Sequence, residues 1–197
     1  MKFGSRALCA FVALAAVEIG IPANAQSKLE PITVYGTLGY SNLVTGHFDL
    51  SAVTGRLGTR FGSYLGVEGE LNVGVNRDSF TYSPPCTGQV CPLVIMLLQD
   101  KLKNSESLYA VGYLPITPDA DLFVRAGYGV ADYSTSKYFH SGFQEQAFKL
   151  GAGGQYFFDD TNGIRLDYTW DDITPKNLVG WDAGGVNVWS IAFTRRF

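Results

Sequence analysis

Residues 164–171 read IRLDYTWD, and every second side chain of this stretch is apolar. The apolar members are Ile164, Leu166, Tyr168 and Trp170, and the residues between them are polar or charged. An α-helix does not produce this alternation, because its side chains repeat every 3.6 residues, whereas successive side chains of a β-strand point to opposite faces. The stretch therefore predicts a β-strand with one apolar face and one polar face.

The same alternation recurs along the chain and outlines further strands. Residues 122–130, LFVRAGYGV, and residues 65–73, LGVEGELNV, both repeat it, and turn-like or polar stretches separate such segments. We expect strands near residues 31–42, 50–61, 64–75, 101–115, 121–132, 145–158, 163–173 and 185–197.

The composition excludes several classes of protein. The chain has 197 residues, of which 46% are hydrophobic and 17% charged, and it contains 23 glycines, 13 phenylalanines and 11 tyrosines. Many aromatic residues with little charge oppose disorder. A formal net charge of −3 without a basic block argues against a nucleic-acid partner. Beyond the N-terminal segment, no apolar run reaches the roughly 18 residues that a membrane helix needs. A single all-β domain remains.

The N-terminal segment, residues 1–25, is predicted to be a cleavable signal peptide. Two basic residues precede an apolar run at residues 7–17, and a small-residue cleavage site, Ala-Asn-Ala, ends at Ala25. A short core helix or a membrane anchor is the alternative, but the apolar run is too short to span a bilayer. The mature domain is therefore expected to cover residues 26–197.

The connections between the expected strands favour a barrel in a membrane. They alternate between short turns and longer segments, which is typical of outer-membrane barrels, and eight is an even number as such barrels require. A soluble lipocalin-type barrel is the alternative, and it would turn its apolar face inward. A polar face rich in Gly and Ala suits the crowded interior of a small barrel. Aromatic residues near strand ends predict interfacial girdles: Tyr64, Tyr113, Tyr156, Phe157, Phe158, Trp170, Trp189 and Phe197.

A set of short segments occurs in a fixed order along the mature chain. It consists of TGRLGTRF at 54–61, GVEGE at 66–70, GAGGQYF at 151–157, RLDY at 165–168 and the terminal Phe197. This order resembles the outer-membrane β-barrel domain family, which includes the transmembrane domain of OmpA and the small opacity, adhesin and invasion-related barrels of Gram-negative bacteria. The resemblance implies an eight-stranded antiparallel up-and-down transmembrane β-barrel with periplasmic termini. It also implies that the barrel-assembly machinery reads Phe197 as an assembly signal.

The polar strand faces point into the lumen if the apolar faces meet lipid. Unpaired charges in a narrow interior would each cost several kcal/mol, so we expect ion pairs there. The network would serve either as a gated ion path or as a structural polar core, and the narrow interior of eight strands favours the core. Its expected members are Arg56, Arg60, Glu68, Glu70, Arg125, Lys149, Arg165 and Asp167.

Cys86 and Cys91 are the two cysteines of the predicted mature chain. An exported chain passes an oxidising compartment, so we predict a disulfide between them. Closing so short a loop contributes only ~2 kcal/mol. A metal site would need further ligands nearby, so we expect no metal or cofactor. Six apolar residues follow at 93–98, and they either mark an interaction surface or extend the fourth strand at the barrel rim or lipid interface.

Three motifs suggest chemistry only weakly. His140 and Ser141 with Glu145 suggest a base and a nucleophile, but adjacent strand residues point to opposite faces, whereas lipid A deacylase barrels set them two apart. Residues 159–163, DDTNG, match a hairpin turn better than a calcium loop. Residues 151–154, GAGG, lie within a strand and not before a helix, so they do not predict a phosphate loop. We therefore expect no enzyme activity.

The sequence predicts a small outer-membrane barrel with a structural or adhesin-like role carried by its external loops. A low-conductance porin for ions or small solutes is the alternative, and a lipid A-modifying enzyme is a distant third. The expected partners are outer-membrane lipid, the barrel-assembly machinery and an extracellular ligand or host surface, and the barrel is expected to be a monomer. The identity of the ligand does not follow from the fold.

Overall fold

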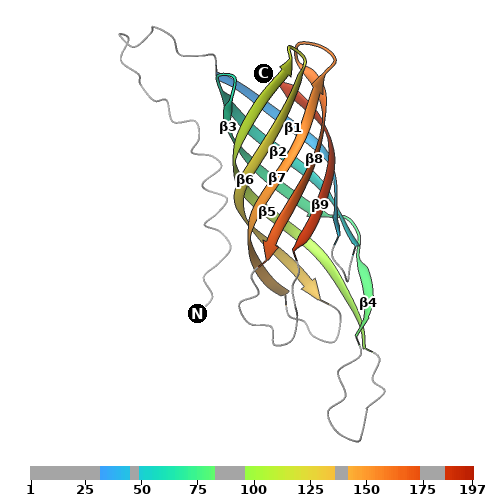
Figure 1. The fold of residues 1–197 in the computed structure, drawn as a ribbon. Coiled ribbons are helices and arrows are strands. Elements are labelled where there is room, and N and C mark those ends of the chain that lie inside the picture. The colour runs from blue at the N-terminus through green and yellow to red at the C-terminus, as the bar shows by residue number, and fades with distance from the viewer. Residues whose placement is uncertain (1–31, 45–48, 83–95, 136–141, 174–184) are drawn as a thin grey trace, which may run out of the picture.

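The computed structural model describes residues 32–44, 49–82, 96–135, 142–173 and 185–197. These residues form antiparallel strands, which Figure 1 shows as a tilted barrel. The strands are β1 (Ile32–Val44), β2 (Asp49–Phe61), β3 (Leu65–Gly74), β4 (Asp78–Tyr82), β5 (Met96–Thr117), β6 (Ala120–Thr135), β7 (Gly142–Phe157), β8 (Asn162–Ile173) and β9 (Val186–Arg196). No helix in these ranges is both long and apolar enough to cross a membrane.

All strands except β4 close into the barrel. Strands that follow one another along the chain pair side by side, and two further pairings, β1 with β9 and β3 with β5, close the ring. Closure removes free edges from the barrel, so each of its eight strands has a hydrogen-bonded neighbour on both sides, whereas β4 pairs with β5 alone. The predicted eight-stranded antiparallel up-and-down barrel is confirmed, and most predicted strand limits agree to within a few residues.

β4 is an additional strand that the sequence pattern did not predict. The β3–β5 pairing ends where Val73 lies opposite Asn104, and β4 then pairs with the start of β5, from Asp78 opposite Asp100 to Tyr82 opposite Met96. β4 and this part of β5 form a two-stranded ribbon that projects beyond the barrel (Figure 1). Five residues are too short a run for alternation to separate a strand from a polar loop.

The ribbon includes part of the apolar segment at 93–98, which was expected either to mark an interaction surface or to extend the fourth strand. Its residues 96–98 belong to β5 and pair with β4, so here the chain extends the fourth barrel strand. Residues 93–95 lie outside the described ranges.

The barrel end opposite the ribbon carries the tight turns and the C-terminus (Figure 1). Gly62 turns the chain between β2 and β3 with a φ of 62°, a left-handed conformation that strains other residues. Asp159 organises the turn between β7 and β8. Its Oδ1 accepts hydrogen bonds from the backbone N–H groups of Thr161 and Asn162, at 2.8 and 2.6 Å. Hydrogen bonds from the Asn162 side chain and these backbone groups lower the pKa of Asp159.

The alternation in β8 separates lipid-facing from lumen-facing residues. Leu166 and Ile164 are about half exposed on the outer wall, whereas Arg165 is fully buried inside. The same outward apolar face continues around the barrel. A soluble barrel would show the reverse arrangement, so the apolar surface requires a lipid surrounding.

Two of the predicted girdle aromatics do not lie on the outer wall. Tyr113 and Phe157 are buried inside the barrel, with 5% and 3% of their surface exposed. Both occupy inward positions of their strands, so their place near a strand end did not decide their direction. The other six predicted girdle residues are exposed: Tyr64, Tyr156, Phe158, Trp170, Trp189 and Phe197.

Candidate functional site: the barrel lumen

The structure places the side chains of all eight predicted lumen residues inside the barrel, where seven are buried and Arg60 is partly exposed. Strand register accounts for this arrangement. Arg56 on β2 lies opposite Glu70 on β3, and inward positions on neighbouring strands continue in step around the ring. The eight residues do not form one network, however. They divide into three groups at different heights, and the largest has six members: Arg56, Glu68, Glu70, Arg125, Arg165 and Asp167.

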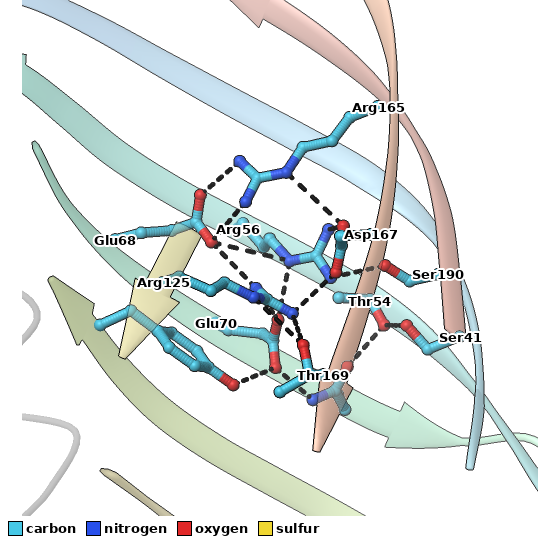
Figure 2. Close-up of polar contacts among 12 residues, drawn as sticks. Ser41, Thr54, Arg56, Glu68, Glu70, Arg125, Arg165, Asp167, Thr169 and Ser190 are labelled. Carbon is cyan, nitrogen blue, oxygen red and sulfur yellow. Dashed lines mark hydrogen bonds and ion pairs between the residues drawn. The ribbon is translucent and has the colours of Figure 1, made fainter. Parts of the chain in front are cut away.

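We call these six residues the central cluster, and Figure 2 shows how they converge from four strands, β2, β3, β6 and β8. Arg56 bridges two carboxylates, with its Nε 2.7 Å from Glu70 Oε2 and its Nη1 3.1 Å from Asp167 Oδ2. Arg125 also bridges Glu70 and Asp167, at 2.8 and 2.7 Å. Three guanidinium groups thus face three carboxylates, and the formal charges of the cluster cancel.

Arg165 contributes the most deeply buried pair of the cluster. Its Nη1 and Nη2 donate to the two oxygens of Glu68, at 2.6 and 3.2 Å. This two-point contact matches the planar guanidinium to the planar carboxylate, which is the strongest geometry for such a pair. The guanidinium carbon of Arg165 also lies 4.0 Å from the ring centre of Phe123. Both charged groups are therefore held in one geometry.

Hydroxyl groups around the central cluster add hydrogen bonds to its charged side chains, and they were not among the predicted lumen residues. Tyr35 donates to Glu68 Oε2 at 2.8 Å, and Tyr113 donates to the Tyr35 oxygen at 2.8 Å. Tyr109 donates to Glu70 Oε1 at 3.2 Å. The alternation could have placed these tyrosines inside by their parity, because they occupy inward positions of β1 and β5. Ser190 and Thr169 act as acceptors instead, for hydrogen bonds from Arg56 and Arg125 (Figure 2).

A second group of ions lies nearer the tight turns, around Asp121. Arg60 Nη1 lies 2.8 Å from Asp121 Oδ2, and Gln155 donates to the same oxygen at 2.8 Å. Arg196 adds a longer contact of 3.4 Å. Asp121 was not among the predicted lumen residues, because it stands at the very start of its expected strand, where parity is hard to judge.

The third group lies on the ribbon side of the central cluster and ends in an apolar layer. Lys149 Nζ is 2.5 Å from Asp171 Oδ2, and both side chains are buried. Next to this pair the lumen is filled by apolar side chains, which we call the apolar plug: Leu43, Leu50, Ala52, Leu102, Tyr133, Ala147, Val186 and Val188. The strand pattern predicted a polar interior throughout and did not indicate the plug.

The family model of the outer membrane protein β-barrel domain matches residues 8–197. The chain belongs to this family. The resemblance seen in the ordered sequence segments is thereby confirmed, and so is the predicted location in the Gram-negative outer membrane.

Solved structures of other small outer-membrane barrels share the fold at low sequence identity. The attachment invasion locus protein Ail of Yersinia pestis, in complex with the heparin analogue sucrose octasulfate, is 16% identical with a TM-score of 0.53, covering 84% of this chain and 97% of Ail. The N-terminal barrel of Pseudomonas aeruginosa OprF is 14% identical with a TM-score of 0.56, covering 86% and 100%. OprG of the same organism is 11% identical with a TM-score of 0.55, covering 87% and 98%. No curated protein matches the chain in sequence.

Several predicted residues of this family member lie outside the described ranges. These are the cleavage site at Ala25, the disulfide pair Cys86 and Cys91, and two of the three residues of the weak catalytic motif, His140 and Ser141. Phe197 is described, with 75% of its surface exposed, and its N–H donates to the Val34 carbonyl at 2.8 Å. Among the described side chains, no group of three or more His, Cys, Asp or Glu residues is arranged to hold a metal ion.

Proposed function

We propose that this outer-membrane barrel is a non-enzymatic surface protein that acts, adhesin-like, through the end that carries the ribbon, and that its lumen does not conduct. The observation that carries the proposal is the filling of the lumen by successive layers. A solute would have to pass the apolar plug, the Lys149–Asp171 pair, the central cluster and the ions around Asp121. An eight-stranded barrel has an interior just wide enough for its own side chains, which supports the same conclusion.

The buried ion pairs of the central cluster oppose the passage of a solute through the lumen. Arg165 and Glu68 have fully buried side chains, and Arg56, Arg125 and Asp167 are each 1% exposed. Separating such a pair leaves a buried charge without its partner, at about 3 to 5 kcal/mol. A small porin would need this separation at each opening, so the porin remains the weaker candidate.

The ribbon of β4 and β5 supports the surface role. It extends the barrel wall away from the membrane-spanning strands at the end of the longer connections, which face outward from the cell in outer-membrane barrels (Figure 1). Ail, which shares the fold, has a heparin analogue in its structure. A barrel of this architecture is therefore compatible with an extracellular ligand, which supports a ligand or host surface as the partner of this protein.

The test is a variant in which residues 78–100 are replaced by a short Gly-Ser turn. β3 and β5 still pair from Leu65 to Val73, so the barrel is expected to close. Cells that display the wild-type protein are expected to adhere to immobilised sulfated polysaccharide or matrix protein, and cells that display the variant are expected to lose this adhesion. A gel shift on boiling confirms that both proteins are folded. Equal adhesion by the two proteins, or none by either, would remove the proposal.

Four further features of this protein are part of the proposal. They are cleavage after Ala25, a disulfide between Cys86 and Cys91, recognition of Phe197 by the barrel-assembly machinery, and a monomeric state. Free-thiol labelling of the unreduced, denatured protein should find no reactive cysteine, and Phe197→Ser should reduce insertion into the outer membrane. Stoichiometric labelling or unchanged insertion would contradict the respective feature.

A further inference from the structure

The lipid-facing wall of the barrel is indented on one side. An apolar hollow of about 670 Å³ lies over β3, β5, β6 and β7. Strand register shows how it forms. Val67, Ala110, Ala126 and Leu150 stand opposite one another on these four strands and make one continuous row of outward side chains. The two middle members of this row are alanines, so the wall is thin there.

Small side chains make the floor, and large ones make the rim. Gly112 lies in the next row toward the tight turns, between Leu65 and Val124. The next row toward the ribbon end is bulky instead. On β3 this row continues with Gly69, whereas on β5, β6 and β7 its members are large and exposed on the outer wall beside the hollow: Leu108, Tyr128 and Phe148.

The chemistry of the hollow suits a hydrocarbon chain. The backbone groups of its four strands are paired in the barrel ladder, so they offer no free hydrogen bonds. Arg125 borders the hollow with its main chain, but its side chain points into the lumen, where it contacts Glu70 and Asp167. The outward side chains around the hollow are apolar, so nothing there would bind a charged headgroup.

The height of the hollow indicates which leaflet it faces. Leu65 and Val67 follow directly after the tight turn at Gly62. Val124 follows shortly after the short turn between β5 and β6. Short turns are periplasmic in outer-membrane barrels. We propose that the hollow binds one acyl chain of a phospholipid from the periplasmic leaflet, by shape and without recognition of the headgroup.

A second copy of the chain fits the hollow less well. A stable protein interface buries about 800 Å² on each partner, usually around large anchoring side chains. The hollow offers a strip centred on the small residues Ala110, Gly112 and Ala126, with larger apolar residues such as Leu65 and Leu150 beside it. This strip accommodates a thin chain, and it is too small to support a dimer by itself.

The experiment reconstitutes the barrel in vesicles of equal parts phosphatidylethanolamine and phosphatidylglycerol, extracts it in mild detergent and counts retained phospholipid by native mass spectrometry. Gly112→Leu fills the hollow. A Cβ at Gly112 meets only Val124 Cγ2 at 3.5 Å, an ordinary contact, so the variant is expected to fold. Gly55→Leu is the matched control, because Gly55 is also an outward glycine, lies on β2 away from the hollow and has open space beside it.

Wild type and Gly55→Leu are expected to retain one phospholipid of either headgroup, and Gly112→Leu about tenfold less, because the leucine takes the place of the acyl-chain contacts. Ala110→Phe fills the hollow from the same strand and serves as the second variant if Gly112→Leu does not fold. Equal retention by all variants, a preference for one headgroup, or a wild-type dimer that Gly112→Leu dissociates would each overturn the proposal.

Discussion

The central cluster and the apolar plug fill neighbouring parts of one lumen by opposite means. The central cluster holds six charged groups whose signs cancel, in a fixed geometry with tyrosine hydroxyls around it. The plug excludes water with Leu50, Leu102 and Val186, which are essentially fully buried. The cluster depends on every partner being present, whereas the plug depends on volume. The comparison teaches that a closed barrel can fill one lumen with a charge-paired core and with an apolar layer beside it.

The largest effect is expected from Arg165→Ala in the central cluster. Removing this guanidinium strands the buried Glu68, so the free energy of unfolding should fall by about 3 to 5 kcal/mol. Urea unfolding in detergent micelles, followed by tryptophan fluorescence, measures the loss. Arg60→Ala is the matched control, because Arg60 is partly exposed near the tight turns and its loss should be clearly smaller. Equal losses would contradict the distinction between the cluster and its surroundings.

The plug is tested by Leu102→Ala. Leu102 is fully buried, so the cavity and the lost packing should lower the free energy of unfolding by about 2 to 5 kcal/mol. Leu108→Ala is its control, since Leu108 lies on the same strand with 68% of its surface exposed to lipid. A loss at Leu108 as large as that at Leu102 would mean that the plug is not a packed layer.

Tyr35→Phe tests whether the hydroxyl groups belong to the central cluster. The variant removes the hydrogen bond to Glu68 and keeps the ring, so it should cost about 1.5 to 3 kcal/mol of unfolding free energy. Tyr40→Phe, on the outward face of the same strand, should leave stability nearly unchanged. A negligible effect of Tyr35→Phe would mean that this hydroxyl does not contribute to the stability of the central cluster.

The smallest effect is expected outside both layers, at the Asp159 turn. Hydrogen bonds lower the pKa of this carboxyl below its ordinary value of 3.8, so the ionised form is favoured in the folded protein. Its contribution is therefore complete above about pH 4 and is lost as the pH falls through the folded pKa. Asp159→Ala should be slightly less stable than wild type at neutral pH, and the difference should vanish in acid. Asp160→Ala in the same turn is the control, and a difference independent of pH would refute this.

Much of the architecture follows from side-chain parity along the strands. Parity assigned Arg165 and Asp167 to the lumen and Leu166 to the lipid before any pairing was known. It did not show which lumen residues meet, because Arg165 and Glu68 are 97 positions apart in the chain and their contact depends on barrel closure.

Parity also failed where the inward face of a strand changes from polar to apolar. The inward positions 43 and 50 lie near strand ends, and position 102 lies just after the ribbon part of β5. All three carry leucines, so the polar face becomes apolar there and produces the plug. Tyr113 was placed in a girdle by its position near a strand end, although its parity pointed inward. The ribbon strand β4 was too short to predict, because its stability comes from pairing with β5.

The central claim, that the lumen is closed, is tested most directly by single-channel recording of the folded wild-type barrel in planar lipid bilayers. The layered lumen predicts no resolvable conductance, or only rare and brief openings, at any salt concentration in which the protein remains folded. Large, steady single-channel currents with a defined ion preference would contradict the closed lumen and would favour a porin.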